Sequence, residues 1–252
     1  MNNMDKYGLI GYPLGHSFSI EYHNQRFADE GINAKYINFE IASIDQLPEV
    51  INSNPELKGL NVTIPYKEKV LEFLDYISPE ARSIGAVNVI RVIHDGSNVV
   101  LKGYNSDVIG FTQSIEPMLE SHHKKALVLG TGGASKAVAY GLKSLGVEPI
   151  FVSRYERPNT IQYANITPEV VKEYNVIVNC TPLGMFPKIN TCPELPYEAL
   201  DENNILYDLI YNPDETLFLK KGAKQGAAVK NGLEMLLLQA FASWEFWNGR
   251  ER

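Results

Sequence analysis

The chain has 252 residues, and its 23 lysines and arginines against 30 aspartates and glutamates give a formal net charge of −7 at pH 7. No long block of basic residues occurs, which argues against a nucleic-acid or anionic-membrane partner, and no run of about 18 apolar residues predicts a membrane span. The two cysteines, Cys180 and Cys192, lack the spacing of disulfide frameworks, redox motifs and zinc sites. We expect a cytoplasmic protein whose ligand is a small molecule.

The first part of the chain contains short apolar strands that alternate with helical stretches, an order typical of α/β folds. Ser43 and Gln46 form a capping box, which predicts that a helix begins near Asp45. Asp95-Gly96 lies between two apolar runs and predicts a β-hairpin, so this region also contains antiparallel strands. The expected strands are 7–11, 36–40, 59–63, 89–93 and 99–102, and the expected helices are 19–31, one near residue 45, and 66–74.

From residue 126 onward, strands and helices alternate as in a doubly wound, Rossmann-type domain. Between Arg154 and Thr167 the helical periodicity is weak, so we expect the second crossover helix to be short or absent. The chain is therefore predicted to form two α/β domains, residues 1–102 with 231–252, and residues 103–230. In the second half the expected strands are 126–130, 149–153, 176–180 and 205–210, and the expected helices are 135–146 and 232–247.

The segment from Gly130 to Ser135 leaves a buried strand and opens a helix, which is the context of a dinucleotide-binding glycine loop. Gly130, Gly132 and Gly133 would let backbone N–H groups approach a pyrophosphate, although Ser135 replaces the third glycine of the common motif. A plain tight turn between strand and helix is the alternative interpretation.

The next strand ends at Ser153-Arg154, at the place where an NAD site has an acidic residue about 20 positions after the glycine loop. A guanidinium there suits the 2′-phosphate of NADP, and Arg157 is a candidate second ligand. The alternatives are that Arg154 is one more surface arginine, or that Glu156 turns inward and opposes a phosphate. The sequence favours NADP.

Lys67 follows Pro65, a residue favoured at the first position of a helix, so the sequence places this lysine in a first helical turn. A cation there opposes the helix dipole, and a residue that breaks a local rule in this way points to function. The same position favours the neutral amine, as a proton-exchanging group requires. The alternative interpretation is a solvated surface lysine.

Asp107 and the pair Ser17 and Ser19 each lie at the start of an expected helix. Asp107, taken alone, is most simply a capping acid. The two serine hydroxyls, with helix N–H groups behind them, form a candidate carboxylate site, although one of them is alternatively the N-cap. His122 and His123 are expected to form a solvated lead-in to the next strand, without a metal.

Taken jointly and in this order, these segments resemble the shikimate dehydrogenase family over nearly the whole chain, from Gly11 to Gln239. The resemblance implies an N-terminal α/β substrate domain, a Rossmann-type domain for NADP, and a cleft between the two. It is carried by the paired serines and the glycine loop, and by residues 61–67 (NVTIPYK), 85–88 (GAVN), 105–107 (NSD), 179–185 (NCTPLGM), 208–213 (DLIYNP) and 232–240 (GLEMLLLQA).

The resemblance also implies the reaction, which is the reversible NADPH-dependent reduction of 3-dehydroshikimate to shikimate. Lys67 would donate a proton to the reduced oxygen and act as base in the reverse direction, with Asp107 orienting it and the substrate. Each substrate hydroxyl needs a polar partner, because an unpaired one costs about 1–3 kcal/mol. The implied substrate ligands are Ser17, Ser19 and Tyr211 for the carboxylate, and Thr63, Lys67, Asn88, Asp107 and Gln239 for the hydroxyls.

NADP is implied to lie on the glycine loop, with its nicotinamide beside the loop that follows strand 176–180. The backbone of Gly232 would reach the carboxamide. The implied cofactor residues are Gly130, Gly132, Gly133, Ala134, Ser135, Ser153, Arg154, Thr181, Leu183, Met185 and Gly232.

The sequence departs from the family pattern in three ways, of which the first is the poorly helical stretch after Tyr155, which suggests a trimmed cofactor domain. Ser106 stands for threonine in the family's Asn-Thr-Asp, and Ser153-Arg154-Tyr155 stands for Asn-Arg-Thr. One alternative is an NAD-dependent quinate/shikimate dehydrogenase, which the serine pair disfavours because the extra hydroxyl of quinate needs room there. The other is a non-catalytic regulatory module that binds a ligand, which the intact Lys67 and Asp107 disfavour. We expect a monomer or a homodimer.

Overall fold

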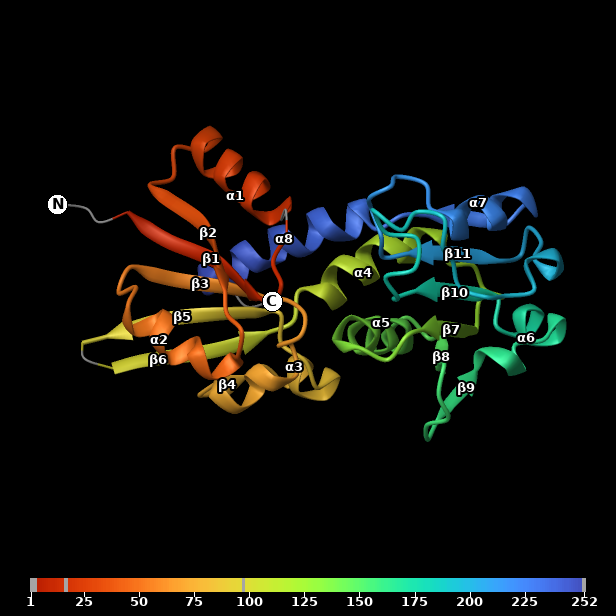
Figure 1. Cartoon of the computed structure of the whole chain (residues 1–252), viewed down its shortest axis with the longest axis horizontal. Coiled ribbons are helices and arrows are strands. Elements are labelled where there is room, and N and C mark those ends of the chain that lie inside the picture. The colour runs from red at the N-terminus through yellow and green to blue at the C-terminus, as the bar shows by residue number, and fades with distance from the viewer. Residues whose placement is uncertain (1–3, 16–17, 97, 251–252) are drawn as a thin grey trace. The chain divides into compact units, whose positions relative to one another are not determined.

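The computed structural model describes residues 4–15, 18–96 and 98–250 (Figure 1). They form two compact α/β units, each with its own six-stranded sheet, which confirms the expected fold class. One unit contains the chain up to Ser106 together with the residues from Ala240 on, and the other contains Asp107–Gln239. The sequence places the domain boundaries after residues 102 and 230, whereas the packing divides the chain after residues 106 and 239.

The sheet of the first unit has the strand order β2-β1-β3-β5-β6-β4. β1 pairs in parallel with β2 and β3, and β5 runs antiparallel to β3 and β6. β5 and β6 form the hairpin that Asp95-Gly96 predicts, and Gly96 has a φ of +61°, which favours glycine in such a turn. The strands are β1 (Asp5–Gly11), β2 (Ala34–Glu40), β3 (Leu57–Val62), β4 (Tyr76–Ile77), β5 (Val89–Asp95) and β6 (Asn98–Tyr104).

The helices of the first unit are short after the first one. The predicted capping box is confirmed, because the Ser43 hydroxyl accepts the Asp45 N–H at 3.3 Å and the Ser43 N–H donates to Gln46 Oε1 at 3.2 Å. The α-helix predicted over residues 66–74 is wrong, and a short 3-10 helix takes part of its place. The α-helices are α1 (Phe18–Asp29), α2 (Leu47–Asn52) and α3 (Pro79–Ile84), and the 3-10 helices are Ile44–Gln46 and Lys69–Phe73.

An aromatic cluster joins β1 and α1 of the first unit to the last turns of the chain's final helix, α8 (Leu233–Trp247). The ring of Tyr7 lies 5.6 Å from Phe27, 5.5 Å from Trp244 and 4.9 Å from Trp247, measured between centroids. Gly59 leaves room for this packing, because a Cβ there would lie 2.2 Å from Cδ1 of Trp247. The end of the chain is therefore part of the first unit's core.

The second unit has six parallel strands in the order β12-β11-β10-β7-β8-β9, which is the doubly wound arrangement with its reversal between β7 and β10. As the weak periodicity after Arg154 predicts, a three-residue strand and a six-residue α-helix link β8 to β10. The strands are β7 (Lys125–Leu129), β8 (Glu148–Ser153), β9 (Thr160–Gln162), β10 (Val176–Asn179), β11 (Ile205–Asp208) and β12 (Ala228–Lys230).

Helices cover both faces of the second sheet. Val128 of β7 packs with Phe111 and Met235 on one face, and Leu127 packs with Phe218 on the other, because successive side chains of a strand point to opposite sides. The α-helices are α4 (Asp107–Ile115), α5 (Gly133–Ser144), α6 (Pro168–Glu173), α7 (Leu217–Lys224) and the start of α8, and the 3-10 helices are Glu116–Met118, Tyr163–Asn165 and Tyr197–Ala199.

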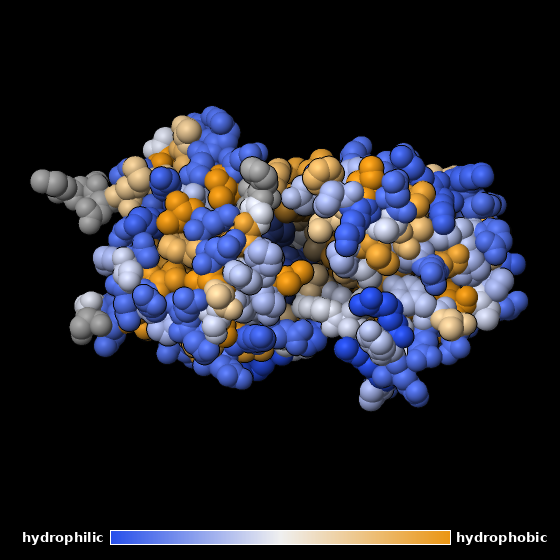
Figure 2. Space-filling model, viewed as in Figure 1, coloured by the Kyte–Doolittle hydropathy of each residue, from blue (hydrophilic) through white to orange (hydrophobic). Residues whose placement is uncertain are grey.

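Hydrophilic residues cover most of the face shown in Figure 2, with hydrophobic residues scattered among them. Scattered exposed apolar side chains are ordinary for a folded domain. Within residues 4–15, 18–96 and 98–250, no helix is both long enough and apolar enough to cross a membrane.

Candidate functional site

The carboxyl ends of β7 and β10 meet where the strand order reverses, and open α/β sheets bind ligands at this point. Gly130 follows β7 directly, and its N–H donates to the Val152 carbonyl at 3.0 Å. Its φ of +114° favours glycine, and a Cβ there would lie 3.4 Å from the Cys180 carbonyl oxygen and from Cγ2 of Thr181. The glycine loop therefore lies against the loop that follows β10.

The glycine loop opens α5, as the motif predicts. Gly132 is the N-cap of this helix, Gly133 is its first residue, and Ala134 lies in its first turn. Ser135, which replaces the third glycine, is buried, and its hydroxyl accepts the Gly132 N–H at 3.1 Å. A Cβ on Gly132 would meet no atom within 4 Å, so the space over the loop is open to a ligand. A phosphate at this helix N-terminus would face the helix dipole favourably.

Two arginines follow β8, and one of them contacts the glycine loop in the structure. Arg157 donates from Nη1 to Oγ1 of Thr131 at 3.2 Å, so its side chain contacts the glycine loop itself. Arg154 lies over the ring of Tyr155, with 5.8 Å from the guanidinium carbon to the ring centroid. Ser153 is buried, and its hydroxyl accepts the Tyr155 N–H at 3.2 Å, so it shapes the turn that presents both arginines.

A cavity of about 700 Å³ opens beside Arg154 in the second unit. Leu183, from the loop after β10, and Lys221, from α7, line it together with Glu194. Two cations and an apolar wall therefore surround a space of the size that cofactor pockets have. The structure brings together two predicted cofactor residues here, Arg154 and Leu183.

Two buried polar residues without a role in the sequence-based prediction hold the loop after β10. Asn179 Oδ1 accepts the N–H and the hydroxyl of Thr181 at 3.0 and 2.7 Å, and its Nδ2 donates to Asp208 at 3.0 Å. Asp208, at the end of β11, also accepts the Thr216 hydroxyl at 2.6 Å and the Ile210 N–H at 3.1 Å. Burial raises the pKa of Asp208 to about 6, and these hydrogen bonds act in the opposite direction. The sequence signal that could have found these two residues is a polar residue at the end of an otherwise apolar strand.

The other predicted residues of this unit follow the carboxyl ends of its strands. Thr181 Oγ1 accepts the Leu183 N–H at 3.3 Å, and Met185, further along the same loop, is half exposed. Gly232 approaches the segment before Tyr211 so closely that a Cβ would lie 2.1 Å from a backbone carbonyl oxygen. Tyr211 is partly exposed, and burial of the rest of the side chain raises its pKa.

Lys67 lies in a turn after β3, and the prediction that it occupies the first turn of an α-helix is wrong. Its carbonyl oxygen accepts the Val87 N–H at 2.8 Å. The Leu71 N–H, which would bond to that oxygen in an α-helix, donates to the Glu68 carbonyl at 3.4 Å. A 3-10 helix, Lys69–Phe73, follows, so Lys67 does not lie at the positive end of an α-helix dipole.

Backbone hydrogen bonds nevertheless bring Thr63, Lys67 and Asn88 to one end of the first sheet. The carbonyl of Asn88 accepts the N–H of Val62, the neighbour of Thr63, at 2.9 Å, and the residue before Asn88 bonds to the Lys67 carbonyl. The Asn88 side chain is buried, and Ser106 holds both ends of its amide, with 3.0 Å from Nδ2 to Oγ and 2.7 Å from Oδ1 to the N–H.

Ser19 lies in the first turn of α1, where its side chain hydrogen-bonds to the phenol of Tyr36. Burial raises the pKa of Tyr36 above its usual range, and the bond to Ser19 acts in the opposite direction. Asn24, further along α1, accepts the Tyr36 N–H at 2.9 Å and donates to its carbonyl at 2.8 Å, so helix and strand are held in register. Ser17 lies outside the described residues, and its role stays a prediction.

Asp107 and Gln239 lie on two packed helices of the second unit. Asp107 is the first residue of α4 and is buried, and Gln239 of α8 donates from Nε2 to the Leu236 carbonyl at 2.9 Å. Gly110 permits the close approach, because a Cβ there would lie 2.5 Å from the Met235 carbonyl oxygen and 3.0 Å from the Gln239 nitrogen. The two predicted substrate ligands on helices of this unit are therefore near each other.

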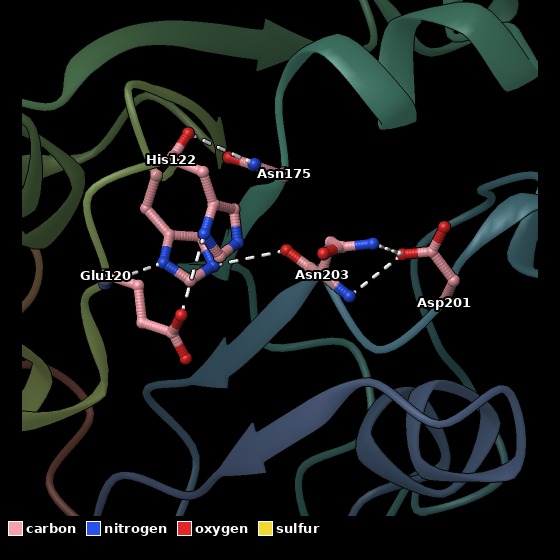
Figure 3. Close-up of polar contacts among 6 residues, drawn as sticks. Glu120, His122, Asn175, Asp201 and Asn203 are labelled. Carbon is pink, nitrogen blue, oxygen red and sulfur yellow. Dashed lines mark hydrogen bonds and ion pairs between the residues drawn. The ribbon is translucent and has the colours of Figure 1, made fainter.

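His122 and His123 precede β7, at the amino ends of the parallel strands, whereas the glycine loop follows the carboxyl end of β7. Figure 3 shows His122 among the polar contacts of Glu120, Asn175 and Asn203. His123 is buried, so the expected solvated lead-in is wrong at this residue. Its Nδ1 accepts the Glu120 N–H at 2.8 Å, its Nε2 lies 3.1 Å from the Asn203 carbonyl oxygen, and burial lowers its pKa. In the part of the chain that the structure describes, no group of three or more His, Cys, Asp or Glu could hold a metal ion.

Comparison with known proteins agrees with this arrangement. A family model described as the shikimate dehydrogenase substrate binding domain matches residues 9–90. A shikimate dehydrogenase (NADP(+)) from Carboxydothermus hydrogenoformans is 40% identical over 259 residues, which cover 96% of this chain and 91% of that protein. The chain belongs to the shikimate dehydrogenase family. Residues 9–90, which match the family's substrate binding domain, include Ser19, Thr63, Lys67 and Asn88.

Crystal structures of shikimate dehydrogenases have the same fold. That of the Aquifex aeolicus enzyme is 34% identical, with a TM-score of 0.85, and the match covers 99% of this chain and 95% of that one. The Thermus thermophilus enzyme, solved in complex with NADP(H) and shikimate, is 30% identical, with a TM-score of 0.84 and coverage of 98% and 94%.

Proposed function

We propose that the protein is an NADP-dependent oxidoreductase that catalyses the reversible reduction of 3-dehydroshikimate to shikimate, a step in chorismate and aromatic amino-acid biosynthesis. The observation that carries the proposal is the set of Thr63, Lys67 and Asn88 at one end of the first sheet, held there by backbone hydrogen bonds in a chain of the shikimate dehydrogenase family. An amine beside a hydroxyl and an amide suits a substrate that carries several hydroxyl groups.

NADP fits the residues at the carboxyl edge of the second sheet. The open space over Gly132 and the N-terminus of α5 suit its pyrophosphate. Arg157 contacts that loop, and Arg154 from the same segment lines the cavity, so their guanidinium groups suit the 2′-phosphate, which NAD lacks. The cavity that Arg154 and Leu183 line has room for part of the cofactor. Thr181, Leu183, Met185 and Gly232 would border the nicotinamide.

The chemistry of the chain's own residues is proton transfer and orientation. When bound, NADPH supplies a hydride to the carbonyl carbon of the substrate. Nζ of Lys67 then gives a proton to the carbonyl oxygen, and in shikimate oxidation the neutral amine takes the hydroxyl proton back. Asp107 orients Lys67 and a neighbouring substrate hydroxyl. Ser17, Ser19 and Tyr211 bind the carboxylate, and Thr63, Asn88 and Gln239 bind the hydroxyl groups.

The test is the nicotinamide absorbance on mixing the purified protein with shikimate or quinate, each with NADP or NAD. We expect NADP to be reduced in the mixture that contains shikimate. The Lys67→Ala protein, measured in parallel, is the control for the site. A response with NAD or quinate alone would keep the reaction class and contradict the proposed specificity. Silence in all four mixtures would contradict the enzyme and favour a non-catalytic, ligand-binding module.

We further propose that the enzyme acts in the cytoplasm, as a monomer or a homodimer, without a nucleic-acid or membrane partner. The net charge of −7, without any long basic block, supports the absence of a polyanionic partner. Light scattering of the purified protein gives the mass in solution, and a trimer or larger assembly would contradict the proposed state.

A further inference from the structure

A buried hydrogen-bond network joins the Asn88 end of the first sheet to the last helix of the chain. Asn61, on β3, lies at its centre, where Oδ1 accepts the Tyr36 hydroxyl at 2.8 Å and Nδ2 donates to Oγ of Ser243 at 3.0 Å. Ser243 Oγ lies 3.0 Å from Ser106 Oγ, and Ser106 contacts the Asn88 amide. All of these side chains are buried, and the two serines have no exposed surface.

The donors and acceptors of this network determine which way the Asn88 amide points. The Ser106 N–H can only donate, so Asn88 must present Oδ1 to it, at 2.7 Å, and Nδ2 then faces Ser106 Oγ. Ser243 Oγ lies 3.0 Å from Ser106 Oγ, closer than Asn88 Oδ1 at 3.4 Å. A hydrogen bond between the two serines therefore restrains the hydroxyl that faces Asn88 Nδ2.

Ser106 is also the residue at which the 105–107 motif departs from the family's Asn-Thr-Asp. Its partner Ser243 comes from 137 positions further along the chain. A hydroxyl without exposed surface is costly unless it has hydrogen-bond partners, and the contact between the two serines is one of the bonds that satisfy them.

We propose that Ser243 is a positioning residue for substrate binding, which acts through Ser106 to hold the Asn88 amide in one orientation toward a substrate hydroxyl. The inference rests on the proposed function, in which Asn88 is a substrate ligand. Ser243 itself does not touch the substrate, since it is fully buried behind Asn61 and Ser106.

Steady-state kinetics of full-length Ser243→Ala test this. We expect the KM for shikimate to rise roughly three- to tenfold, which corresponds to the loss of about one hydrogen bond. We expect kcat and the KM for NADP to stay within about twofold of the wild type. Ser106→Ala, which keeps the backbone N–H to Asn88, is expected to give the same pattern. In an Asn88→Ala background, Ser243→Ala is expected to cause no further rise, because the side chain that it orients is absent.

Ser78→Ala is the matched control. The Ser78 hydroxyl caps α3 in the same unit, where it accepts the Ala81 N–H at 3.2 Å, so its loss is expected to lower thermal stability and leave the KM for shikimate unchanged. An equal rise for Ser243→Ala with and without Asn88 would overturn the inference, because the serine would then act on the fold at large.

The outcomes separate this inference from the proposed function. If Asn88→Ala raises the KM for shikimate but Ser243→Ala and Ser106→Ala do not, the positioning role is overturned and the function stands. If the wild-type protein does not oxidise shikimate, or if Asn88→Ala leaves its KM unchanged, the proposed function or its substrate site fails first.

Discussion

The guanidinium of Arg157 donates a hydrogen bond to the hydroxyl of Thr131, 3.2 Å away, inside the glycine loop. A side chain that follows β8 is thereby attached to the loop that we propose binds the pyrophosphate. Arg154, from the same segment, lines the adjacent cavity. We therefore propose that these two cations, both from the segment after β8, favour NADP over NAD.

Replacing either arginine is expected to weaken NADP selectively. For Arg154→Ala and Arg157→Ala we expect the KM for NADP to rise about tenfold or more, because a charge-assisted hydrogen bond is worth about 1.5–3 kcal/mol, while the KM for NAD changes little. Lys143→Ala, on the last turn of α5, where the lysine pairs with Glu148 at 3.7 Å, is the control. Equal losses with the two cofactors would rule out a contact with the 2′-phosphate.

Lys67→Ala is expected to lower turnover strongly and keep most of the substrate affinity. General acid–base groups contribute about 10²- to 10⁴-fold to rate, so kcat should fall by that factor, while calorimetry should still detect shikimate binding. Lys69→Ala, two residues away on an exposed position, is the control and is expected to stay active. A fully active Lys67→Ala protein would remove this lysine from the mechanism.

Replacement by alanine is expected to affect a different property at Gly110 than at Gly132. Gly110→Ala should lower the free energy of unfolding by about 1–3 kcal/mol, because its Cβ would lie 2.5 Å from a backbone oxygen of α8, which cannot move alone. Gly132→Ala should leave unfolding nearly unchanged and weaken NADP binding, because its Cβ would point into the open space over the loop. Urea unfolding and NADP titration separate the two effects, and a Gly110→Ala protein as stable as the wild type would show that α4 and α8 pack less closely.

His23 should make the protein sensitive to acid. Burial, and secondly the charge of Arg26, lower its pKa from 6.5 to about 3, and its ring stacks on Tyr36 with 4.7 Å between centroids. Below about pH 6.5 the unfolded chain binds a proton at His23, whereas the folded protein does not. The contribution of His23 to the free energy of unfolding is therefore fully present above that pH and is lost as the pH falls toward 3.

The protonation of His23 alone changes the free energy of unfolding by up to about 1.4 kcal/mol per pH unit. Urea unfolding of the wild type and of His23→Phe, followed from about pH 8 to pH 4, measures it. We expect the wild-type curve to fall more steeply below about pH 6.5, and parallel curves would show that His23 takes up its proton equally well in the folded protein.

Local signals predicted much of the second unit, including the glycine loop. The apolar runs at β7, β8, β10 and β11 and the glycines around residue 132 are short-range patterns, so the Rossmann-type fold and the loop that opens α5 followed from sequence. The weak periodicity after Arg154 likewise predicted a short crossover, because a helix without an apolar stripe has nothing to bury.

Long-range contacts decided the features that sequence reasoning missed. The turn at Lys67 depends on the N–H of Val87, and the burial of His123 depends on the carbonyl of Asn203, 80 positions away. The partnership of Ser106 and Ser243 is more distant still, and no periodicity marks it. Such contacts form only when the sheets are assembled, so a reading of neighbouring residues cannot supply them.

The packing of Trp247 into the space beside Gly59 determines which unit can finish folding first as the chain is synthesised. The second unit is one continuous stretch, residues 107–239, and it can fold as soon as that stretch has left the ribosome. The first unit is begun earlier but needs Trp244 and Trp247 to close its aromatic cluster around Tyr7. The part of the chain that is translated first is therefore finished last, and a chain truncated before Trp244 would contain a complete second unit and an incomplete first unit.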